Sequence, residues 1–467
     1  MKKLLTILTF TFSLLAQYEW SAPVQLSELG NSPVTYYIIP SISVDKLGTI
    51  HAFWIKLIED EPYEWHSQIE YRKSNDNGIS WSVVENLTPE YLTERIYDLK
   101  SVCDSQNNIH LVYLRGTEYN KVMYKKFDGT SWTEPYVVHD YAVTNLEIGI
   151  DYSDRLYATW FSAYSSNVYF AFLDSVWSSP QPVSSSGQYT IRDITFDKDN
   201  NLYSVGRSTG STARPFLLKY SRIDEQWTLF EEIYDPGETS AGNAITVSGS
   251  DTIYVNISIG PYMDDNMNYI VKKHKNDSVW SVPEYVNENT DTSSRKLFID
   301  NDNNLHLYGI YFGENIELIY STNSSNTWTH DLINQSNGYF DATYDRIDNF
   351  YVAYSNQSTV YFQSKKIEVG IENDDEWIID NFTLGQNYPN PFNNSTTIQF
   401  LLKNSSDINL TIYNSKGESV KNLISDKLSK GNYSYTFSAD NLNSGIYYYQ
   451  LNINGRVKDT KKMLHLK

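Results

Sequence analysis

The chain has 467 residues, of which 40% are hydrophobic and 15% aromatic, enough for two or three domains with substantial cores. The net charge of −20 is uneven, because residues 17–379 carry −26 and residues 380–467 carry +4. The acidic part argues against nucleic acid and anionic membranes as ligands, and it is compatible with cations and neutral polysaccharides. The single cysteine, Cys103, excludes a disulfide within one chain, so the core must stabilise the fold.

Residues 1–16, MKKLLTILTFTFSLLA, have the features of a secretory signal peptide. Two lysines precede an apolar run, which ends at the small residue Ala16. The run is shorter than the ~20 apolar residues that a membrane span needs, which disfavours an anchor. No other segment of the sequence is suited to span a bilayer. The sequence therefore predicts a mature protein, beginning at residue 17, that is secreted or attached to the cell surface.

A unit of two strands recurs seven times between residues 18 and 366. Each copy is an apolar strand ending in Asp, a short polar turn, and a second apolar strand that opens with His or Tyr. The anchors of the seven turns, 45 to 59 residues apart, are Asp45, Asp104, Asp151, Asp197, Ser248, Asp300 and Asp345. Asp and Asn suit such turns because their side chains accept bonds from nearby backbone N–H groups. At the opening position, His51, His110 and His306 alternate with Tyr, which favours packing and hydrogen bonding over metal ligation.

A second motif, Trp followed by Ser or Thr, lies between successive anchors. Its six copies are at Trp81, Trp132, Trp177, Trp227, Trp280 and Trp328, and a seventh, Trp20, stands at the mature N-terminus. The last repeat has no Trp of its own, so we expect the N-terminal strand to complete it and to close a ring. Repeats of this length with about four strands are typical of β-propellers. We therefore predict an all-β fold in which residues 17–366 form a seven-bladed β-propeller, and the alternative is an open β-solenoid.

One turn carries a more specific signature. Residues 74–81, SNDNGISW, fit the pattern S-x-D-x-G-x-x-W, and shorter versions end at Trp132 and Trp280. This pattern resembles the Asp-box, or BNR repeat, of sialidase-like propellers, where it is a folding element. The Asp is expected to cap the hairpin, the Gly to adopt positive φ and the Trp to pack under the turn.

The sequence after residue 366 differs from the repeats. Residues 367–381 are predicted to be an acidic linker. Residues 382–467 alternate apolar and polar residues between Gly and Asn turns, which favours a small Ig-like antiparallel sandwich. They contain QNYPNPFN at 386–393, LNSGIYYY at 442–449 and KKMLHLK at the end, and resemble the type A sorting domain of type IX secretion substrates. The residues that carry the motif are Tyr388, Pro389, Asn390, Pro391, Phe392, Gly445, Tyr447 and Lys462.

This resemblance implies recognition by the type IX secretion machinery, export through the periplasm of a Gram-negative, Bacteroidetes-like bacterium, and release or anchoring at the cell surface. One departure is Asn394, where the family usually has Pro. An ordinary Ig-like binding module is the alternative, because a fold alone does not define a function.

Candidate ligand-binding residues are those just before the anchor strands, where propellers usually bind ligands. They are Glu147, Arg192, Asn243, Arg295 and Asp341, with Arg95 further upstream in the loop before Asp104, and we add Trp65 in the long insertion 58–68. A ring of arginines and acids suits a carboxylated sugar, and a solvated channel rim is the alternative. We expect a non-catalytic module that binds glycan or protein.

The competing hypothesis is a sialidase-like glycoside hydrolase. That family needs three arginines, a Tyr–Glu pair and an Asp. The early Phe-Arg-Ile-Pro motif is missing, since residues 37–40 read YIIP, and known sialidases have six blades. No catalytic residue is therefore assigned, and a clustered arginine triad in the channel mouth would favour the hydrolase.

No cofactor is predicted, with one qualification for calcium. Asp197 with Asp199, and Asp300 with Asp302, begin like a D-x-D-x-N calcium loop, but neither loop has the closing Glu at its twelfth position. As plain turn residues, these acids should tolerate replacement by Asn, since Asn keeps the side-chain acceptor.

Overall fold

The computed structural model describes residues 20–28, 35–61, 64–89, 94–117, 120–140, 143–162, 165, 167–183, 189–208, 213–237, 240–260, 267–287, 290–312, 315–324, 327–345, 349–365, 382–385, 387, 389–402, 405–414, 418–439, 442–454 and 456–466. The predicted signal peptide (1–16) and linker (367–381) lie outside these ranges. The chain divides into two compact units, Met1–Val369 and Gly370–Lys467. Every regular element in the described ranges is a β-strand, which confirms the all-β class.

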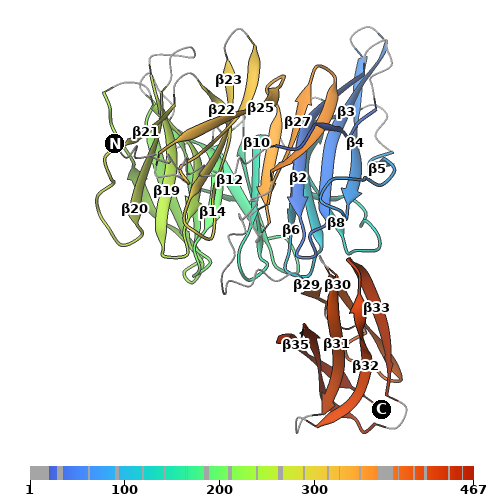
Figure 1. The fold of residues 1–467 in the computed structure, drawn as a ribbon. Helices are drawn as coiled ribbons and strands as arrows, with labels where there is room; N and C mark the ends of the chain where they lie inside the picture. Colours follow the sequence, from blue (N-terminus) through green and yellow to red (C-terminus); the bar gives the residue numbers. More distant parts are fainter. Residues whose placement is uncertain are drawn as a thin grey trace, which may run out of the picture. The chain divides into compact units, whose positions relative to one another are not determined.

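Four-stranded antiparallel sheets follow one another along the larger unit (Figure 1). The first three sheets are β2 (Thr35–Val44), β3 (Ile50–Glu61), β4 (Glu64–Ser74) and β5 (Glu85–Asn86); β6 (Arg95–Cys103), β7 (Ile109–Gly116), β8 (Lys121–Phe127) and β9 (Tyr136–His139); and β10 (Val143–Ile150), β11 (Leu156–Ser162), β12 (Asn167–Leu173) and β13 (Gln181–Pro182). The fourth and fifth are β14 (Tyr189–Phe196), β15 (Leu202–Ser208), β16 (Pro215–Ser221) and β17 (Gln226–Glu232); and β18 (Ser240–Val247), β19 (Thr252–Ile259), β20 (Met267–His274) and β21 (Glu284–Asn287).

The sixth sheet is β22 (Thr290–Ile299), β23 (Leu305–Phe312), β24 (Ile316–Thr322) and β25 (Thr329–Gln335). The seventh combines both ends of this unit: β26 (Phe340–Tyr344), β27 (Phe350–Asn356) and β28 (Thr359–Lys365) are joined by β1 (Val24–Gln25). In β1, Val24 pairs with Phe362, and Trp20 forms a separate bridge to Lys365. The N-terminal segment is therefore the outer strand of the last sheet.

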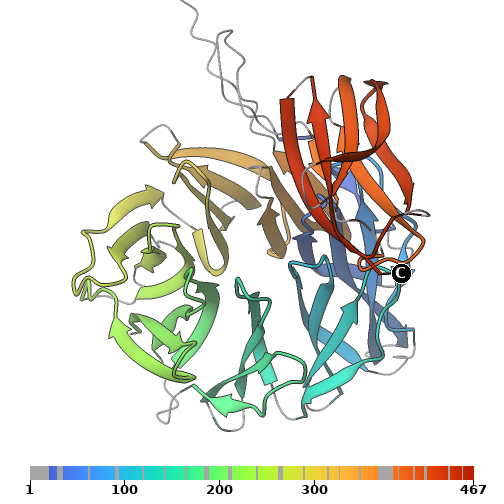
Figure 2. The ribbon, with the colours of Figure 1, turned by 90° about the horizontal axis from the view of Figure 1, so that it is seen from below.

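The sheets are placed around a common centre in a propeller-like arrangement (Figure 2). The first strand of each sheet contacts the first strand of the next, and β26 contacts β2, so these contacts run the whole way round. We call the end where these innermost strands begin the starting face, and the opposite end, which carries the anchor turns, the turn face.

Apolar cores lie between adjacent sheets rather than inside any one sheet. Each of seven buried clusters draws on two neighbouring sheets, including one cluster between the seventh sheet and the first. One motif Trp packs against each cluster: Trp132, Trp227, Trp81, Trp177, Trp280, Trp20 and Trp328, respectively. The Trp recurs with the repeat because every junction needs a large ring to fill it.

The anchor turns share one hydrogen-bond pattern. In Asp300, Oδ1 accepts from the backbone N–H groups of Asp302 (2.9 Å) and Asn304 (2.7 Å). The equivalent bonds recur at Asp45, Asp104, Asp151 and Asp197. The third residue after the anchor has positive φ, which explains the choice of Gly, Asn and Asp at Gly48, Asn107, Asp154, Asn200, Asp251 and Asn303.

The second carboxylate oxygen of the anchor explains the alternation of His and Tyr. Oδ2 of Asp300 lies 3.0 Å from Nε2 of His306, whose Nδ1 lies 2.7 Å from the hydroxyl of Tyr320. In the seventh sheet the Tyr351 hydroxyl takes the same place and donates to Asp345 over 2.9 Å. The imidazole N–H of His and the hydroxyl of Tyr can both donate to the anchor Asp, so the two side chains substitute for one another as core hydrogen-bonding groups.

These contacts sharpen the expectation for Asp300. Burial would raise the pKa of this carboxyl, but hydrogen bonds from His306 and Asn304 outweigh it and hold the pKa below its ordinary value. Asp300→Asn keeps the oxygen that accepts from the turn, but its amide NH₂ faces two other donors, the side chains of Asn304 and His306. We therefore expect this variant to lose about 1–2 kcal/mol of folding stability rather than show a mild effect. Asp300→Ala also loses the turn bonds and should cost about 2–3 kcal/mol.

Thermal and denaturant unfolding of the two variants, with Asp302→Asn at an exposed carboxylate of the same turn as control, measures these costs. A lowered folded-state pKa stabilises fully above the unfolded value of about 3.9 and is lost as pH falls through the folded value. The gap between wild type and Asp300→Asn should therefore narrow below about pH 4. A large calcium-dependent rise in melting temperature that both Asn variants abolish would contradict the turn role.

Candidate functional site

One position of the innermost strands, four residues before each anchor, carries most of the charge at the ring centre. In every sheet it pairs with the second-strand residue two places after the His or Tyr position, so the seven residues are equivalent in register. They are Ser41, Lys100, Glu147, Asp193, Ala244, Lys296 and Asp341. The structure thus turns a repeat in the sequence into a ring of lysines and carboxylates.

The charges of this ring are largely paired with one another. Lys100 Nζ lies 3.5 Å from Glu147, and Lys296 Nζ lies 3.8 Å from Asp341. The Asp341 carboxylate also accepts from the hydroxyl of Ser41 over 3.0 Å. Because Lys100 interacts electrostatically with carboxylates of β6, β10, β14 and β26, the network spans several sheets.

Two carboxylates of the network are held closer to neutrality. Burial raises the pKa of Asp98 to about 6 and that of Asp193 to about 7, with nearby Glu147 adding to both shifts and the lysines opposing them. Asp193 Oδ2 accepts from the backbone N–H of Ile245 over 2.9 Å, which fixes its orientation. Burial would lower the pKa of Lys100, but Glu147 and Asp98 more than compensate, so its pKa is raised. The carboxyls of Asp98 and Asp193 therefore bind a proton more readily than exposed ones, and Lys100 keeps its charge beside Glu147.

The binding residues expected from sequence fall into separate groups. Glu147 and Asp341 belong to the ring network. Arg192 donates to the Asn243 side chain over 2.7 Å, which links β14 to β18. Arg95 lies elsewhere, over the ring of Trp65, and the side chain of Arg295 lies outside the described residues. Among the described side chains, no cluster of three arginines forms.

Four members of the ring network were not among the residues expected from the sequence: Asp98, Lys100, Asp193 and Lys296. The signal was available for three of them, since counting back four residues from each anchor finds Lys100, Asp193 and Lys296. Asp98 lies two residues before Lys100, at a position where the other six repeats have no charged residue, so the repeat gives no signal for it.

Of the eight exposed Tyr and Phe side chains in the described ranges, Tyr136, Tyr152, Phe230 and Tyr285 lie on other strands and turns, and four lie near the starting face. These four come from the sixth, seventh, first and second sheets, which are neighbours around the ring, and are Phe312 (46% exposed), Tyr339 (43%), Tyr36 (38%) and Tyr97 (38%). Trp65, at the start of β4, lies beside Tyr36 with ring centroids 5.8 Å apart. We call this set the aromatic arc. Large exposed rings on adjacent elements are typical of interaction surfaces.

The calcium candidates are engaged by other groups. Lys275 Nζ lies 2.6 Å from Asp199 and 3.8 Å from Asp197. Asp300 is bonded to its own turn and to His306, while Asp302 is exposed. In the part of the chain that the structure describes, no three His, Cys, Asp or Glu side chains are grouped to hold a metal ion.

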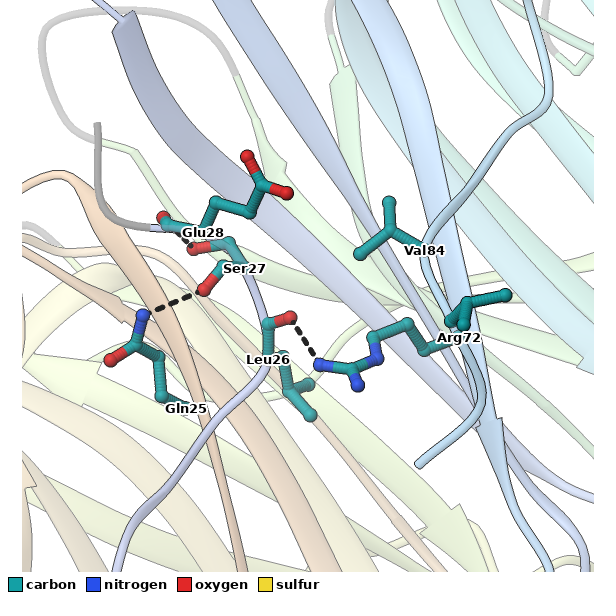
Figure 3. A pocket seen from close by; sticks show the side chains of 7 residues that line it. Gln25, Leu26, Ser27, Glu28, Arg72 and Val84 are labelled. Atoms are coloured by element: carbon teal, nitrogen blue, oxygen red, sulfur yellow. Dashed lines mark hydrogen bonds between the residues drawn. The ribbon is translucent and has the colours of Figure 1, made fainter. Parts of the chain in front are cut away.

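A shallow pocket of about 550 Å³ lies where the N-terminal segment meets the first sheet (Figure 3). Arg72 points at the N-terminal segment and donates to the Leu26 carbonyl over 2.9 Å and to that of Ser82 over 2.5 Å. Leu26 itself is fully buried. The polar groups of the pocket therefore hold the ring closure together, which makes it a structural seam.

In the C-terminal unit, two sheets enclose one core. One contains β29 (Phe382–Leu384), β30 (Ser395–Leu402) and β33 (Gly431–Ser438), and the other β32 (Ser419–Leu428), β31 (Ser406–Asn414), β34 (Gly445–Ile453) and β35 (Arg456–His465). Phe392 is 2% exposed, and its backbone bonds Leu464 and Leu466 on either side of His465. Asn390 Oδ1 accepts from the Leu464 N–H over 2.8 Å. The segment 389–392 thus clasps the C-terminal strand.

The other motif residues divide into buried and exposed ones. Tyr447 is buried and donates to the Asn443 carbonyl over 2.9 Å. Pro389, Pro391 and Lys462 are exposed, and a Cβ added at Gly445 would meet no atom within 4 Å. Tyr388 lies outside the described residues.

Residues 386–465 match the protein family described as the secretion system C-terminal sorting domain. The match confirms the sorting domain that the sequence predicts. A sorting domain of this kind indicates export by type IX secretion to the outside of the cell or its surface. No helix in the described ranges is long and apolar enough to cross a bilayer. No curated protein matches the chain.

Solved structures resemble the chain at low identity. The BP39L lectin of Burkholderia pseudomallei is 9% identical, with a TM-score of 0.54, over 72% of this chain and 97% of the lectin. A Dyadobacter fermentans protein of unknown function is 10% identical, with a TM-score of 0.47, over 75% and 99%. A Hadza microbial sialidase is 12% identical, with a TM-score of 0.42, over 71% and 66%. At 9% identity the likeness to the lectin concerns the fold alone, and the other two similarities are too low to carry an argument.

Proposed function

We propose that residues 17–366 form a seven-bladed β-propeller that binds glycan without cleaving it, delivered to the cell surface or medium by the sorting domain at 382–467. Cleavage after Ala16 starts the mature chain, and residues 367–381 link the two domains. The segment 74–81 acts as an Asp-box: Asp76 accepts from the Ser80 N–H over 2.9 Å, Gly78 has positive φ, and Trp81 Nε1 donates to the Gly78 carbonyl over 3.1 Å. The two C-terminal sheets form an Ig-like sandwich.

The state of the ring centre supports a non-catalytic role. A glycosidase needs one carboxyl group free to protonate the leaving oxygen and a second free to attack or to activate water. Here Glu147 and Asp341 are paired with lysines. Burial raises the pKa of Asp193 to about 7, as a general acid would need, but its carboxyl is engaged by the backbone N–H groups of Ile245 and Ile194. A sialic-acid carboxylate also needs clustered arginines, whereas Arg192 is bonded to Asn243 and Arg95 lies apart.

The aromatic arc is the observation that carries the binding role. Its three Tyr rings and Phe312 are 38–46% exposed and Trp65 is partly exposed, although the molecule buries most of its other large rings between sheets. Exposed Tyr, Trp and Phe provide rigid apolar contact area at a small entropy cost, which suits the flat apolar faces of sugar rings. The acidic body directs the choice toward ligands without negative charge.

A glycan array probed with the mature chain, together with a panel of fluorogenic glycosides that includes a sialoside, tests this function. We expect retention on glycans and no release of fluorophore above the buffer rate. Turnover that Glu147→Gln or Asp341→Asn abolishes would establish a hydrolase instead. Failure to bind any glycan would overturn the proposal and favour a protein ligand instead.

A further inference from the structure

The hairpin of the first sheet is longer than its counterparts. β3 has 12 residues and β4 has 11, whereas the second and third strands of the other six sheets have 7 or 8. The extra residues extend the hairpin by roughly 10–15 Å on the starting face. Extensions of a single repeat map to loops on one face, often the binding face. The core of the ring does not account for this extension, because the other sheets pack without it.

Three side chains from separate strands meet along this hairpin. Tyr36 of β2 and Trp65 of β4 have ring centroids 5.8 Å apart, with planes inclined by 31°. The Arg95 guanidinium, at the start of β6, lies 5.6 Å from the Trp65 ring. We call these three residues the hairpin platform. Trp, Tyr and Arg are the residue types that dominate binding hot spots.

The polar atoms of the platform are available to a ligand. Within the described ranges, no hydrogen bond or ion pair engages the Tyr36 hydroxyl, Trp65 Nε1 or the Arg95 guanidinium. The contrast with the motif tryptophans is clear, since Nε1 of Trp81, Trp280 and Trp328 donates to Gly78, Glu231 and Glu284. Trp65 also lies outside both repeat motifs. Two inclined rings flanked by unused donors are the groups that stack on a sugar ring and bond its hydroxyls.

Charge around the platform selects the kind of glycan. The segment 58–64, IEDEPYE, contains four acidic residues in the sequence, of which Glu59 and the exposed Glu64 are described on the hairpin that carries Trp65. Like charges within a Debye length of about 8 Å repel, so a uronate or sialate polymer would be disfavoured here. Sugar hydroxyls accept from Arg and donate to carboxylates, so an uncharged glycan satisfies both groups.

We infer that the hairpin platform, Tyr36 with Trp65 and Arg95, is the primary binding site and that its ligand is a neutral glycan stacked on the two rings. The inference rests on the proposed function and specifies its site and ligand class.

Affinity electrophoresis and calorimetry of the full mature chain test the site. The probes are neutral polymers (glucan, mannan, xylan and galactan) and anionic ones (alginate and polygalacturonate). We expect binding to at least one neutral polymer and a loss of tenfold or more for Trp65→Ala and Tyr36→Ala, with unchanged melting temperatures. Arg95→Met should lose affinity by a smaller factor, because stacking remains. Tyr152→Ala, which removes a ring 67% exposed in an anchor turn on the turn face, is the matched control and should bind like wild type.

The outcomes separate this inference from the proposed function. Glycan binding that Trp65→Ala leaves intact overturns the platform while the glycan-binding function stands. Preference for alginate or polygalacturonate over every neutral polymer overturns the ligand class. Binding of no glycan overturns both. If Trp65→Ala lowers the melting temperature, Trp65→Phe, which keeps a ring and removes Nε1, should restore stability and most of the affinity, and failure to restore affinity at wild-type stability contradicts stacking.

Discussion

Removal of residues 17–27 from the mature chain should abolish cooperative folding of the larger unit. These residues supply the outer strand of the seventh sheet, with the Leu26 N–H bonded to the Val360 carbonyl over 2.8 Å. Trp20 packs edge-on against Tyr320 at a centroid distance of 5.5 Å, and Leu26 is fully buried between the last sheet and the first. Loss of the segment opens the ring at this junction and exposes the edge of β28.

The expected magnitude follows from the two side chains. Truncation of a buried Leu costs about 2–5 kcal/mol, and the partly buried Trp20 adds less than a fully buried Trp, whose truncation costs about 3–5 kcal/mol. Their sum is comparable to the net stability of a typical domain, about 5–15 kcal/mol. Circular dichroism and calorimetry of the shortened chain measure the loss. A synthetic peptide of residues 17–28 should restore the transition in proportion to its concentration, since it can add as a strand to β28.

Ala22→Ser, at an exposed position of the same segment, is the control and should change stability by less than about 0.5 kcal/mol. A shortened chain that unfolds at the wild-type temperature with the wild-type denaturant dependence would disprove ring closure by the N-terminal strand.

Deletion of residues 382–467 should leave the larger unit folded but stop its delivery to the cell surface. The C-terminal unit has a core of its own, in which Ile398, Leu410, Tyr449 and Met463 are fully buried, and no residue of it belongs to the cores between the seven sheets. The truncated chain should accumulate in the periplasm of a host with type IX secretion. Cell fractionation and protease access at the surface report its location, and calorimetry reports its folding.

Two point variants sharpen this experiment. Phe392→Ser removes a buried ring that anchors the clasp on the C-terminal strand, so it should destabilise the sorting domain by about 3–5 kcal/mol and reduce export. Lys427→Ala, at an exposed position of β32, should be exported normally. Surface delivery of the truncated chain at the wild-type level would refute the sorting role.

Local chemistry explains which parts of the fold were predictable. The hydrogen bonds of each anchor turn join residues at most six positions apart, as Asp300 bonds Asp302, Asn304 and His306. The residue types at these positions therefore predict the geometry of the turn. The Trp motif was equally readable, because one ring fills each junction between sheets. The segment 389–392, which clasps the C-terminal strand, is part of the motif by which the sorting domain was predicted.

The candidate site depended on contacts between distant residues. Lys100 and Glu147 are 47 positions apart and meet because their strands are neighbours at the ring centre. Arg95 and Arg192, nine and five residues before their anchors, were both expected at the binding face, yet one lies over Trp65 and the other binds Asn243. Bulges, such as the one between Ile96 and Asp98, change which side chains reach the centre, and the sequence does not mark them.

The sequence by itself determined the repeat, its seven anchored turns, the all-β class and the sorting domain, because these follow from short-range hydrogen bonding, alternation and a local motif. Only the tertiary structure decided which charges neutralise one another at the ring centre and that Tyr36, Trp65 and Arg95 come together on one hairpin. The physical reason is that strand twist, bulge position and the contact of sheet with sheet set the direction of each side chain, and these are properties of the assembled ring rather than of any one segment.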